Sequence, residues 1–487
     1  MMKRRDALKA IGGLGAAAGM AKFLPGCGSD DGGPVGIKTI VYMMMENRSY
    51  DHLLGGRALA GLPGDGQRPG FFNPDAAGNL IAAFAAEDDH NAGSSSVCDP
   101  DPPHGWDPSH ASFNGGAMDG FIKAHQAEHM NSSADPMKFL TRANVPVTWA
   151  LADQYTVCDR WFCSVMGPTL PNRAYWHAAT SFGIDNNSEV LSKFGSGVPV
   201  PTIYNKLDEA GVDWAYYFGS LAVVSLLGNA GPFQLDLGPN DGTGRIRRFG
   251  DSKQGNGQFF QDAADGKLPS VVYIDPAFGI NDDHPPVHTI LGQELIASVY
   301  TALAKSPQWN NILFVVTYDE HGGYFDHVPP PMTTDDTLAK YAKPGFEQLG
   351  FRVPALVMGP YAKQRYVSNV QYDHTSALKH LQNHFQLGGL NARMEAANDL
   401  TDCIDQDRLA RGEPAPPIEI PQLNSDEWPF GTMTCVPLKG DFLTADDPIT
   451  AWADANPTAF RGYDTRGDKD EYLKSIHTYC VNNGLYK

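Results

Sequence analysis

The chain alternates short apolar runs with stretches of helical spacing, and this alternation constrains its fold more than any other feature. The runs are rich in β-branched and aromatic residues, which is typical of strands buried on both faces. They cover residues 37–45, 211–218, 270–275, 311–318 and 353–359. Apolar residues at helical spacing mark 201–210 and 289–306. The alternation predicts an α/β fold, a three-layer sandwich with a largely parallel central sheet.

Polar side chains follow several of these runs. Glu46 and Asn47 follow the first, and Asp319-Glu320-His321 follows the run at 311–318. The run at 270–275 leads into the acidic stretch 281–286. Because the carboxyl ends of parallel strands share one edge of a sheet, we expect these groups to meet there. Such groups bind metals or transfer protons. For any single stretch, the alternative is a solvated, charged turn.

The segment 165–176, "VMGPTLPNRAYW", contains the best candidate nucleophile. Gly167-Pro168 predicts a turn, and Pro171 suits the first turn of a helix. Thr169 would then lie at a helix N-terminus, where backbone N–H groups favour an anion. We predict that Thr169 attacks phosphorus and that Asn172 and Arg173 donate hydrogen bonds to phosphate oxygens. The alternative is an ordinary helix cap.

Composition limits the partners. The chain has 487 residues, of which 42% are hydrophobic, so it can bury a large core. Its net charge of −19 disfavours nucleic acid, which such a surface would repel. A small phosphorylated substrate remains compatible with this charge, since the charge of a bound metal would dominate its own site.

The first 26 residues predict an export signal. The pair Arg4-Arg5 resembles a twin-arginine signal, and residues 24–27, ending at Cys27, resemble a lipoprotein cleavage box. The alternative to lipidation of Cys27 is plain cleavage near Gly26. We expect a periplasmic, cell-surface or secreted protein, with residues 27–36 as a tether and 37–487 as a single domain. Within it, residues 55–135 form a cap, and the part after about 400 is irregular.

Six cysteines remain after Cys27. An even number in an exported protein is compatible with disulfides, and no spacing is typical of a zinc site. We therefore interpret them as structural or free: Cys98, Cys158, Cys163, Cys403, Cys435 and Cys480.

Four motifs occur in order along the chain. They span residues 46–52, 104–121, 167–173 and 317–331. Together they resemble the bacterial phosphoesterase family that contains phospholipases C and related acid phosphatases. The resemblance covers most of the chain after the export signal and is weakest at the C-terminal end. It implies an alkaline-phosphatase-like fold and a hydrolase of phosphoric esters.

The resemblance also implies roles for individual residues. It assigns a divalent metal to Glu46, Asn47, Asp319 and Glu320, with Thr169 as both nucleophile and ligand. His104, His284 and His321 match histidines that line the phosphate site, and the match of His374 is weaker. Calcium, magnesium, manganese, zinc and iron all suit oxygen ligands with histidines nearby.

We therefore expect a phospholipase C that cleaves a phosphodiester such as phosphatidylcholine through a phospho-threonine intermediate. The expected partners are a small phosphate ester or a phospholipid headgroup, with transient contact to a membrane surface. One alternative is a broad acid phosphatase acting on monoesters. Another is a lipid-anchored binding protein without catalysis, although every matching position is filled here. Thr169 disfavours a sulfatase, because a threonine cannot be oxidised to the aldehyde that sulfatases use. The metal and the oligomeric state stay open.

Overall fold

An eight-stranded mixed sheet organises the protein. The structure is a computed structural model that describes residues 36–86, 101–129, 134–189, 201–220, 222–224, 244–249, 258–285, 287–424 and 469–487. Gly36–Lys487 form one compact unit. The strand order is β12-β6-β11-β10-β1-β9-β7-β8. The predicted export signal lies outside the described residues.

The centre of the sheet is parallel and fully buried. β1 (Thr39–Met45) lies between β10 (Ile312–Tyr318) and β9 (Val271–Asp275). β7 (Trp214–Phe218) and β8 (Ile246–Arg248) continue the sheet in the same direction. Met45 pairs with Tyr318 in register, so the residues that follow both strands leave the sheet side by side. The predicted meeting of strand ends is confirmed for these two strands.

The other half of the sheet contains the antiparallel pairs. β11 (Ala355–Met358) runs opposite to β10 and to β6 (Thr156–Cys158), and β12 (Tyr366–Ser368) pairs parallel with β6. The strand predicted at 353–359 is therefore present but reversed. A reversed strand needs no crossover, so residues 319–354 stay at the edge where β10 ends and can build a site there.

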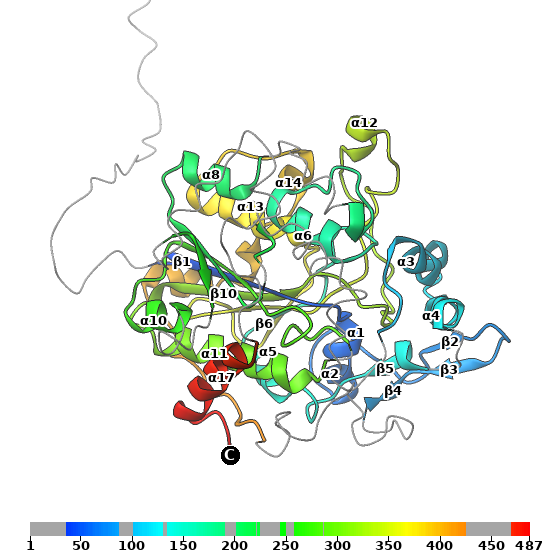
Figure 1. Cartoon of the computed structure of the whole chain (residues 1–487), viewed down its shortest axis with the longest axis horizontal. Helices are drawn as coiled ribbons and strands as arrows, with labels where there is room; N and C mark the ends of the chain where they lie inside the picture. The colour runs from blue at the N-terminus through cyan, green and yellow to red at the C-terminus, as the bar shows by residue number, and fades with distance from the viewer. Residues whose placement is uncertain are drawn as a thin grey trace, which may run out of the picture. The chain divides into compact units, whose positions relative to one another are not determined.

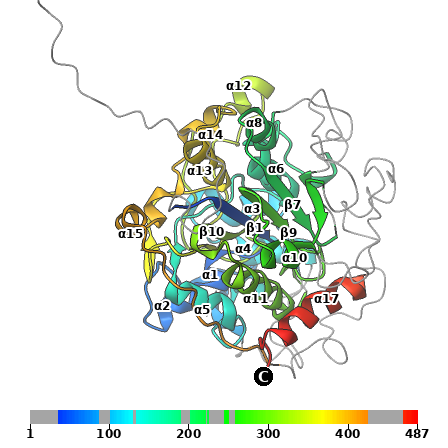
Figure 2. The same cartoon turned by 90° about the vertical axis from the view of Figure 1, so that its left-hand side faces the viewer.

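Helices cover both faces of the sheet (Figures 1 and 2), which confirms the three-layer architecture. One layer contains α5 (Pro146–Gln154), α10 (Gln258–Ala264), α11 (Thr289–Lys305) and α17 (Lys469–Asn482). The other contains α6 (Thr169–Ala178), α8 (Ile203–Glu209), α13 (His374–Phe385) and α14 (Ala392–Ala396). The predicted helices at 201–210 and 289–306 correspond to α8 and α11.

The segment predicted as a cap, 55–135, has more regular structure than its composition indicates. It follows the short α1 (Tyr50–Leu53) and lies on the right in Figure 1. Its elements are α2 (Gly56–Leu59), the hairpin of β2 (Phe72–Pro74) and β3 (Leu80–Ala82), β4 (Phe84–Ala85), α3 (Trp106–Phe113) and α4 (Phe121–His129). β4 pairs with β5 (Lys138–Phe139). Phe121 and Ile122 of α4 pack with Phe325 and Phe351 in a separate small core.

The remaining described elements are short. α12 (Thr337–Tyr341) lies in the long connection after β10, and α15 (Gln406–Arg411) follows the turn Leu400–Cys403. Cys158, Cys163, Cys403 and Cys480 are buried and free, whereas Cys98 and Cys435 lie outside the described residues. Among the helices described, none has the length and apolar character needed to cross a bilayer.

Candidate active site

The ends of β1 and β10 are locked together by an unusual backbone conformation at Asn47. Asn47 has φ 59°, and its N–H donates to Asp319 Oδ1 at 3.0 Å. Gly322 faces it closely, since a Cβ there would lie 2.0 Å from the Asn47 carbonyl oxygen. A left-handed non-glycine residue costs about 1–3 kcal/mol, and such residues cluster at functional sites. The backbone contact with Asp319 holds the end of β1 beside the end of β10.

Three buried oxygen atoms at these strand ends have no hydrogen-bond partner among the described residues. They are Asn47 Oδ1, Asp319 Oδ2 and Glu320 Oε1. Asp319 and Glu320 are fully buried, so leaving these oxygens unsatisfied is costly. Carboxylate and amide oxygens are the donor set that hard divalent cations prefer. These residues therefore fit the metal that the family resemblance implies.

The acids also repel one another. Burial and the charge of Asp319 raise the pKa of Glu46 well above its ordinary value, against the attraction of Arg173. Burial raises the pKa of Asp319 to about 6, and Glu320 adds to the rise while Arg173 opposes it. The site therefore carries more negative charge than its own cationic side chain balances. A bound cation would relieve this excess.

Thr169 is the first residue of α6, as predicted. The preceding Pro168 provides no side-chain cap, so the first turn of the helix does not use the threonine hydroxyl. Instead, Thr169 Oγ1 donates to Glu46 Oε2 at 3.3 Å. The structure thus brings the predicted nucleophile to a predicted metal ligand that is 123 residues away in the sequence.

Arg173 lies one turn after Thr169 and is completely buried among acids. Its Nε donates to Glu46 Oε1 at 2.8 Å, and its Nη1 donates to Asp275 Oδ1 at 2.9 Å. It therefore tethers α6 to the ends of β1 and β9. Asp275 was not among the predicted site residues, although its place as the last residue of β9 was a usable signal.

Asn172 has a different place from the predicted one. Its Nδ2 donates to the carbonyls of Gly167 and Pro168 at 2.9 and 3.2 Å, and its Oδ1 accepts from Val165 N–H at 3.0 Å. The amide is therefore committed to shaping the loop that presents Thr169, rather than turned to a phosphate.

His321 and His374 contact the residues that carry the acids of the site. His321 Nδ1 lies 3.1 Å from Glu320 Oε2, and its ring packs on Phe351 with centroids 4.3 Å apart. His374 Nε2 donates to the Asp319 carbonyl at 2.7 Å, and burial lowers the pKa of His374 to about 4. Both rings orient the predicted metal ligands, and neither contact is one that lines a phosphate site.

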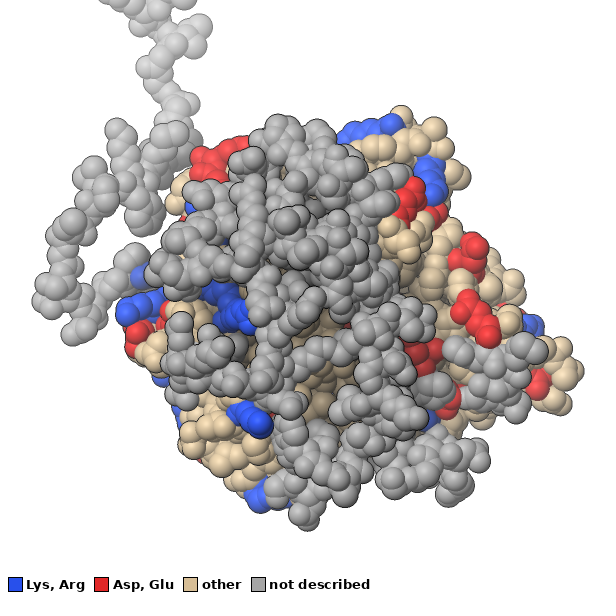
Figure 3. All heavy atoms as spheres, viewed as in Figure 1, with Lys and Arg blue, Asp and Glu red and all other residues tan. Residues whose placement is uncertain are grey.

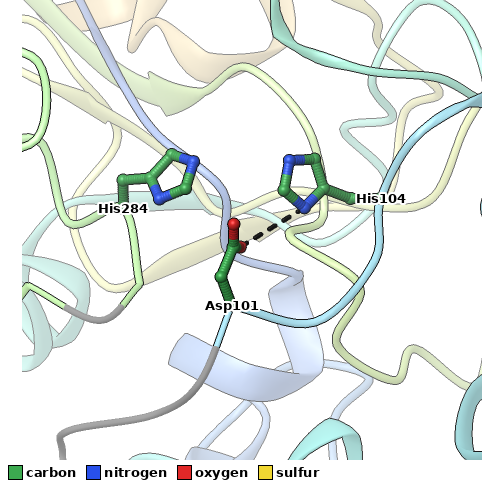
Figure 4. A group of neighbouring side chains, drawn as sticks. All are labelled: Asp101, His104 and His284. Atoms are coloured by element: carbon green, nitrogen blue, oxygen red, sulfur yellow. Dashed lines mark ion pairs between the residues drawn. The ribbon is translucent and has the colours of Figure 1, made fainter. Parts of the chain in front are cut away.

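His104 and His284 face one another across the site, together with Asp101 (Figure 4). Their ring centroids are 5.7 Å apart, and Asp101 Oδ1 lies 3.4 Å from His104 Nδ1. His104 Nε2 lies 3.2 Å from Asn47 Nδ2, which joins the cap to the strand ends. Burial favours the neutral ring, but Glu320 and Asp101 outweigh it and raise the pKa of His104 to about 9. Sequence reasoning missed Asp101, which no motif marked.

Comparisons with known proteins show which family the chain belongs to. The model of the Phosphoesterase family matches residues 37–388. The chain belongs to this phosphoesterase family. It is 34% identical to non-specific phospholipase C5 of Arabidopsis thaliana over 378 residues, 70% of this chain and 68% of the relative. It is 30% identical to phospholipase C A of Mycobacterium tuberculosis over 422 residues, 78% of this chain and 80% of the relative.

The phosphoesterase resemblance predicted from the four motifs is therefore confirmed, and the chain is a phosphoric ester hydrolase. Among solved structures, an alkaline phosphatase superfamily protein from Vibrio parahaemolyticus matches with a TM-score of 0.34 and 12% identity. The match covers 71% of this chain and 83% of that one.

Proposed function

We propose that this phosphoesterase is a metal-dependent phospholipase C that uses Thr169 as a covalent nucleophile. The observation that carries the proposal is the contact of Thr169 Oγ1 with Glu46 Oε2, beside the unpartnered oxygens of Asn47, Asp319 and Glu320. A binding protein that had lost its catalysis would not need a hydroxyl at this place. The names of the relatives, phospholipases C from a plant and a bacterium, support the reaction class.

Glu46, Asn47, Asp319 and Glu320 would hold the cation, with Thr169 as a further ligand. The bound cation would lower the pKa of the threonine hydroxyl and attract phosphate oxygens. The oxygen-rich donor set favours calcium, magnesium or manganese, while the neighbouring histidines keep zinc and iron open.

The chain's own groups carry out the two transfers. Thr169 Oγ1 passes its proton to Glu46 Oε2, the oxygen to which it donates, and attacks phosphorus, while the bond from phosphorus to the glycerol oxygen breaks. His104 or His284 gives that oxygen its proton, so diacylglycerol leaves as a neutral alcohol. Water then attacks phosphorus of the phospho-threonine and the bond from phosphorus to Oγ1 breaks. One water proton returns to the histidine, and Glu46 returns the first proton to Thr169 Oγ1. The products are a phosphorylated headgroup and free Thr169.

The N-terminus of α6 and Arg173 support the attack. The dipole of α6 favours the negative charge of a phosphate at Thr169, although Leu170 N–H in its first turn already donates to Asn187 Oδ1. Arg173 holds Glu46 and Asp275 in place and offsets part of their charge. The side chain of Asn172 holds the Thr169 loop by donating hydrogen bonds to backbone carbonyls of that loop.

The substrate we propose is a phosphodiester with a phosphorylcholine-like head, such as phosphatidylcholine. A net charge of −19 suits a headgroup with a cationic end better than a bare phosphate dianion. The second candidate is an acid phosphatase that acts on monoesters, because the same nucleophile and ligands would serve it.

A direct comparison of substrates tests this choice. The soluble chromogenic ester p-nitrophenyl phosphorylcholine and p-nitrophenyl phosphate are hydrolysed by one preparation loaded with each metal in turn. We expect the diester to have the larger kcat/KM. A tenfold preference for the monoester would replace the phospholipase by the acid phosphatase.

The covalent step has its own test. Acid quenching during turnover of a phosphorylcholine ester, followed by peptide mass spectrometry, should find phosphorylcholine on the peptide that contains Thr169. Thr169→Ala should abolish both this adduct and turnover, by about 10³-fold or more if covalent attack is obligatory. Thr169→Ser keeps the hydroxyl and should retain both. Phosphorylcholine on another residue, or turnover by the alanine variant, would move the nucleophile elsewhere.

We also propose export by the twin-arginine route, from the sequence of residues 1–27 alone. A site that needs a metal is best assembled before translocation. Replacement of Arg4 and Arg5 by lysine should leave precursor in the cytoplasm, and mass analysis of the mature N-terminus would reveal a lipid on Cys27. Normal export of the lysine variant would exclude this route without affecting the enzyme assignment.

A further inference from the structure

Large exposed apolar side chains gather on two projections beside the candidate active site. The described chain exposes seven such residues, and five of them lie in these projections. Phe72 and Leu80 lie in the β2–β3 hairpin, and Met332, Leu338 and Tyr341 lie in and before α12. Single exposed apolar residues need no explanation, but a local concentration indicates an interaction surface.

In the hairpin, the apolar face is the outer one. Phe72 and Pro74 alternate with Asn73, which is buried, and Leu80 pairs with Pro74 across the hairpin. Asn73 Nδ2 donates to the Met118 carbonyl, and its Oδ1 accepts from Phe121 N–H at 2.9 Å, so the inner face is fixed on α4. Leu80 remains 61% exposed. In Figure 3 this projection, at the right, is mostly apolar or neutral with isolated charges.

The α12 projection repeats this arrangement. Leu338 and Tyr341 are three residues apart and therefore lie on the same side of the helix. Met332, just before the helix, is 60% exposed. In Figure 1, α12 lies at the top right, and α3 and then the hairpin lie below it on the same side of the molecule. The two projections thus face outward on the side where the cap lies.

Trp106 connects these projections to the candidate active site. It starts α3 two residues after His104, and its ring lies 5.0 Å from that of Phe346, in the segment that follows α12. It also lies against Gly167, where a Cβ would be 3.2 Å from the Trp106 ring. Gly167 precedes Thr169 by two residues. Trp106 therefore joins the segment after α12 to the loop that carries the nucleophile.

We propose that Phe72, Leu80, Met332, Leu338 and Tyr341 form an interfacial surface that seats on a zwitterionic phospholipid bilayer and delivers lipid to the site. This inference rests on the proposed phospholipase function, whose substrate is packed in bilayers. Lys340 is paired with Asp336 and Lys343 with Asp185, so these lysines are not an unpaired basic cluster for anionic lipid. The net charge of −19 also favours a surface of zwitterionic heads.

Binding is measured by flotation of the full-length protein with phosphatidylcholine vesicles. Thr169→Ala is used as the background so that the lipid is not consumed. Two double variants are compared with it, Phe72→Ser with Leu80→Ser, and Met332→Ser with Leu338→Ser. Each should weaken vesicle binding by about tenfold or more, because two large apolar side chains no longer enter the interface.

The chain offers matched controls. Leu59 of α2 and Val481 of α17 are equally exposed apolar residues outside the projections, at 46% and 52%. Their serine variants should bind vesicles like the background protein. In the active enzyme, each projection variant should lose hydrolysis of vesicle phosphatidylcholine and keep hydrolysis of soluble p-nitrophenyl phosphorylcholine.

Three results would overturn the inference: no flotation of the background protein, equal weakening by the controls, or projection variants that bind as before. Sedimentation velocity tests whether a second copy of the chain occupies the surface instead. A dimer that the projection variants dissociate would assign the surface to a second copy of the chain instead. Failure of the proposed function would give a different result: the protein would not hydrolyse the soluble diester, whether or not it binds vesicles.

Discussion

Two clusters of buried acids come from the same two stretches of sequence, and they differ in whether their oxygens have hydrogen-bond donors. The catalytic acid cluster consists of Glu46, Asp319 and Glu320. The structural acid cluster consists of Asp51, Asp326 and His327, which lie five to eight residues further along the same stretches. The members of both clusters are buried or nearly so, and both clusters join the segment after β1 to the segment after β10.

The structural acid cluster is closed by Arg352. The Arg352 guanidinium donates to Asp326 through Nε and Nη2 at 2.8 and 3.0 Å and to Asp51 Oδ1 at 3.1 Å. His327 Nδ1 lies 2.6 Å from Asp51 Oδ2. Every carboxylate oxygen of Asp51 and Asp326 therefore has a hydrogen-bond donor. A metal would have to displace these donors, although the acids and the histidine lie close enough to bind one.

The catalytic acid cluster keeps unpartnered oxygens, and this is the difference that matters. Number of acids, burial and spacing are similar in the two clusters, so none of them separates a ligand set from an ion-pair network. Oxygens without a hydrogen-bond donor do, because three of them lie at the ends of β1 and β10, where a bound cation would satisfy them. Four experiments can break or sharpen this comparison.

The largest expected effect is on turnover. Asp319→Asn removes one ligand charge and should lower kcat by about 10³-fold, together with the metal content. Asp326→Asn is the matched change in the structural acid cluster, and its folded fraction should keep metal and activity. Elemental analysis and kcat on the soluble diester decide between them. A full metal complement in the Asp319 variant would refute the ligand assignment.

The next largest effect is on stability, and here a change in the structural acid cluster matters while metal binding does not change. Arg352→Met leaves the buried carboxylates of Asp51 and Asp326 without their cation, which should cost about 3–5 kcal/mol of unfolding free energy. The metal bound per folded molecule should not change. Urea unfolding of the metal-loaded protein measures the loss. A loss below about 1 kcal/mol would mean that this network is not what holds the two segments together.

A pH series in the presence and absence of chelator probes the catalytic acid cluster. The pKa of Glu46 is raised, and that of Asp319 is raised to about 6, so the folded chain without metal binds more protons than the unfolded chain. Its stability should therefore fall as the pH rises from 4 to 7, by about 2–3 kcal/mol for Asp319. The gain in Tm from added metal should widen over the same range. Asp319→Asn should flatten the series.

The smallest effect concerns His327. Burial favours the neutral ring, but the bond to Asp51 and the charges around it raise the pKa of His327. Its stabilisation is full below the ordinary histidine pKa and is lost as the pH rises through the raised value. His327→Gln should therefore cost about 1–2 kcal/mol at pH 6 and less at pH 9. A cost that does not change with pH would mean that the ring acts only by packing, for example on Phe71.

The sequence by itself determined the layers of the fold, the parallel strands at its centre and the residues that leave them. It also placed Thr169 at the start of a helix. These features depend on local patterns, namely apolar runs, helical spacing and turn residues, which act within a few residues of one another. Glu46, Asn47 and Asp319 were therefore predictable as a group, since parallel strands that end together carry their next residues to one place.

The tertiary structure decided which polar side chains have partners. Arg352 reaches Asp51 across 301 residues, and Arg173 reaches Asp275 across 102. No local pattern encodes such pairs, because they depend on how the segments pack. For the same reason Asn172, His321 and His374 could be found by motif but their partners could not be predicted: Asn172 bonds its own loop, His321 contacts Glu320, and His374 bonds the Asp319 carbonyl. Packing likewise decided that Asn47 Oδ1, Asp319 Oδ2 and Glu320 Oε1 are left without a hydrogen-bond donor at the strand ends.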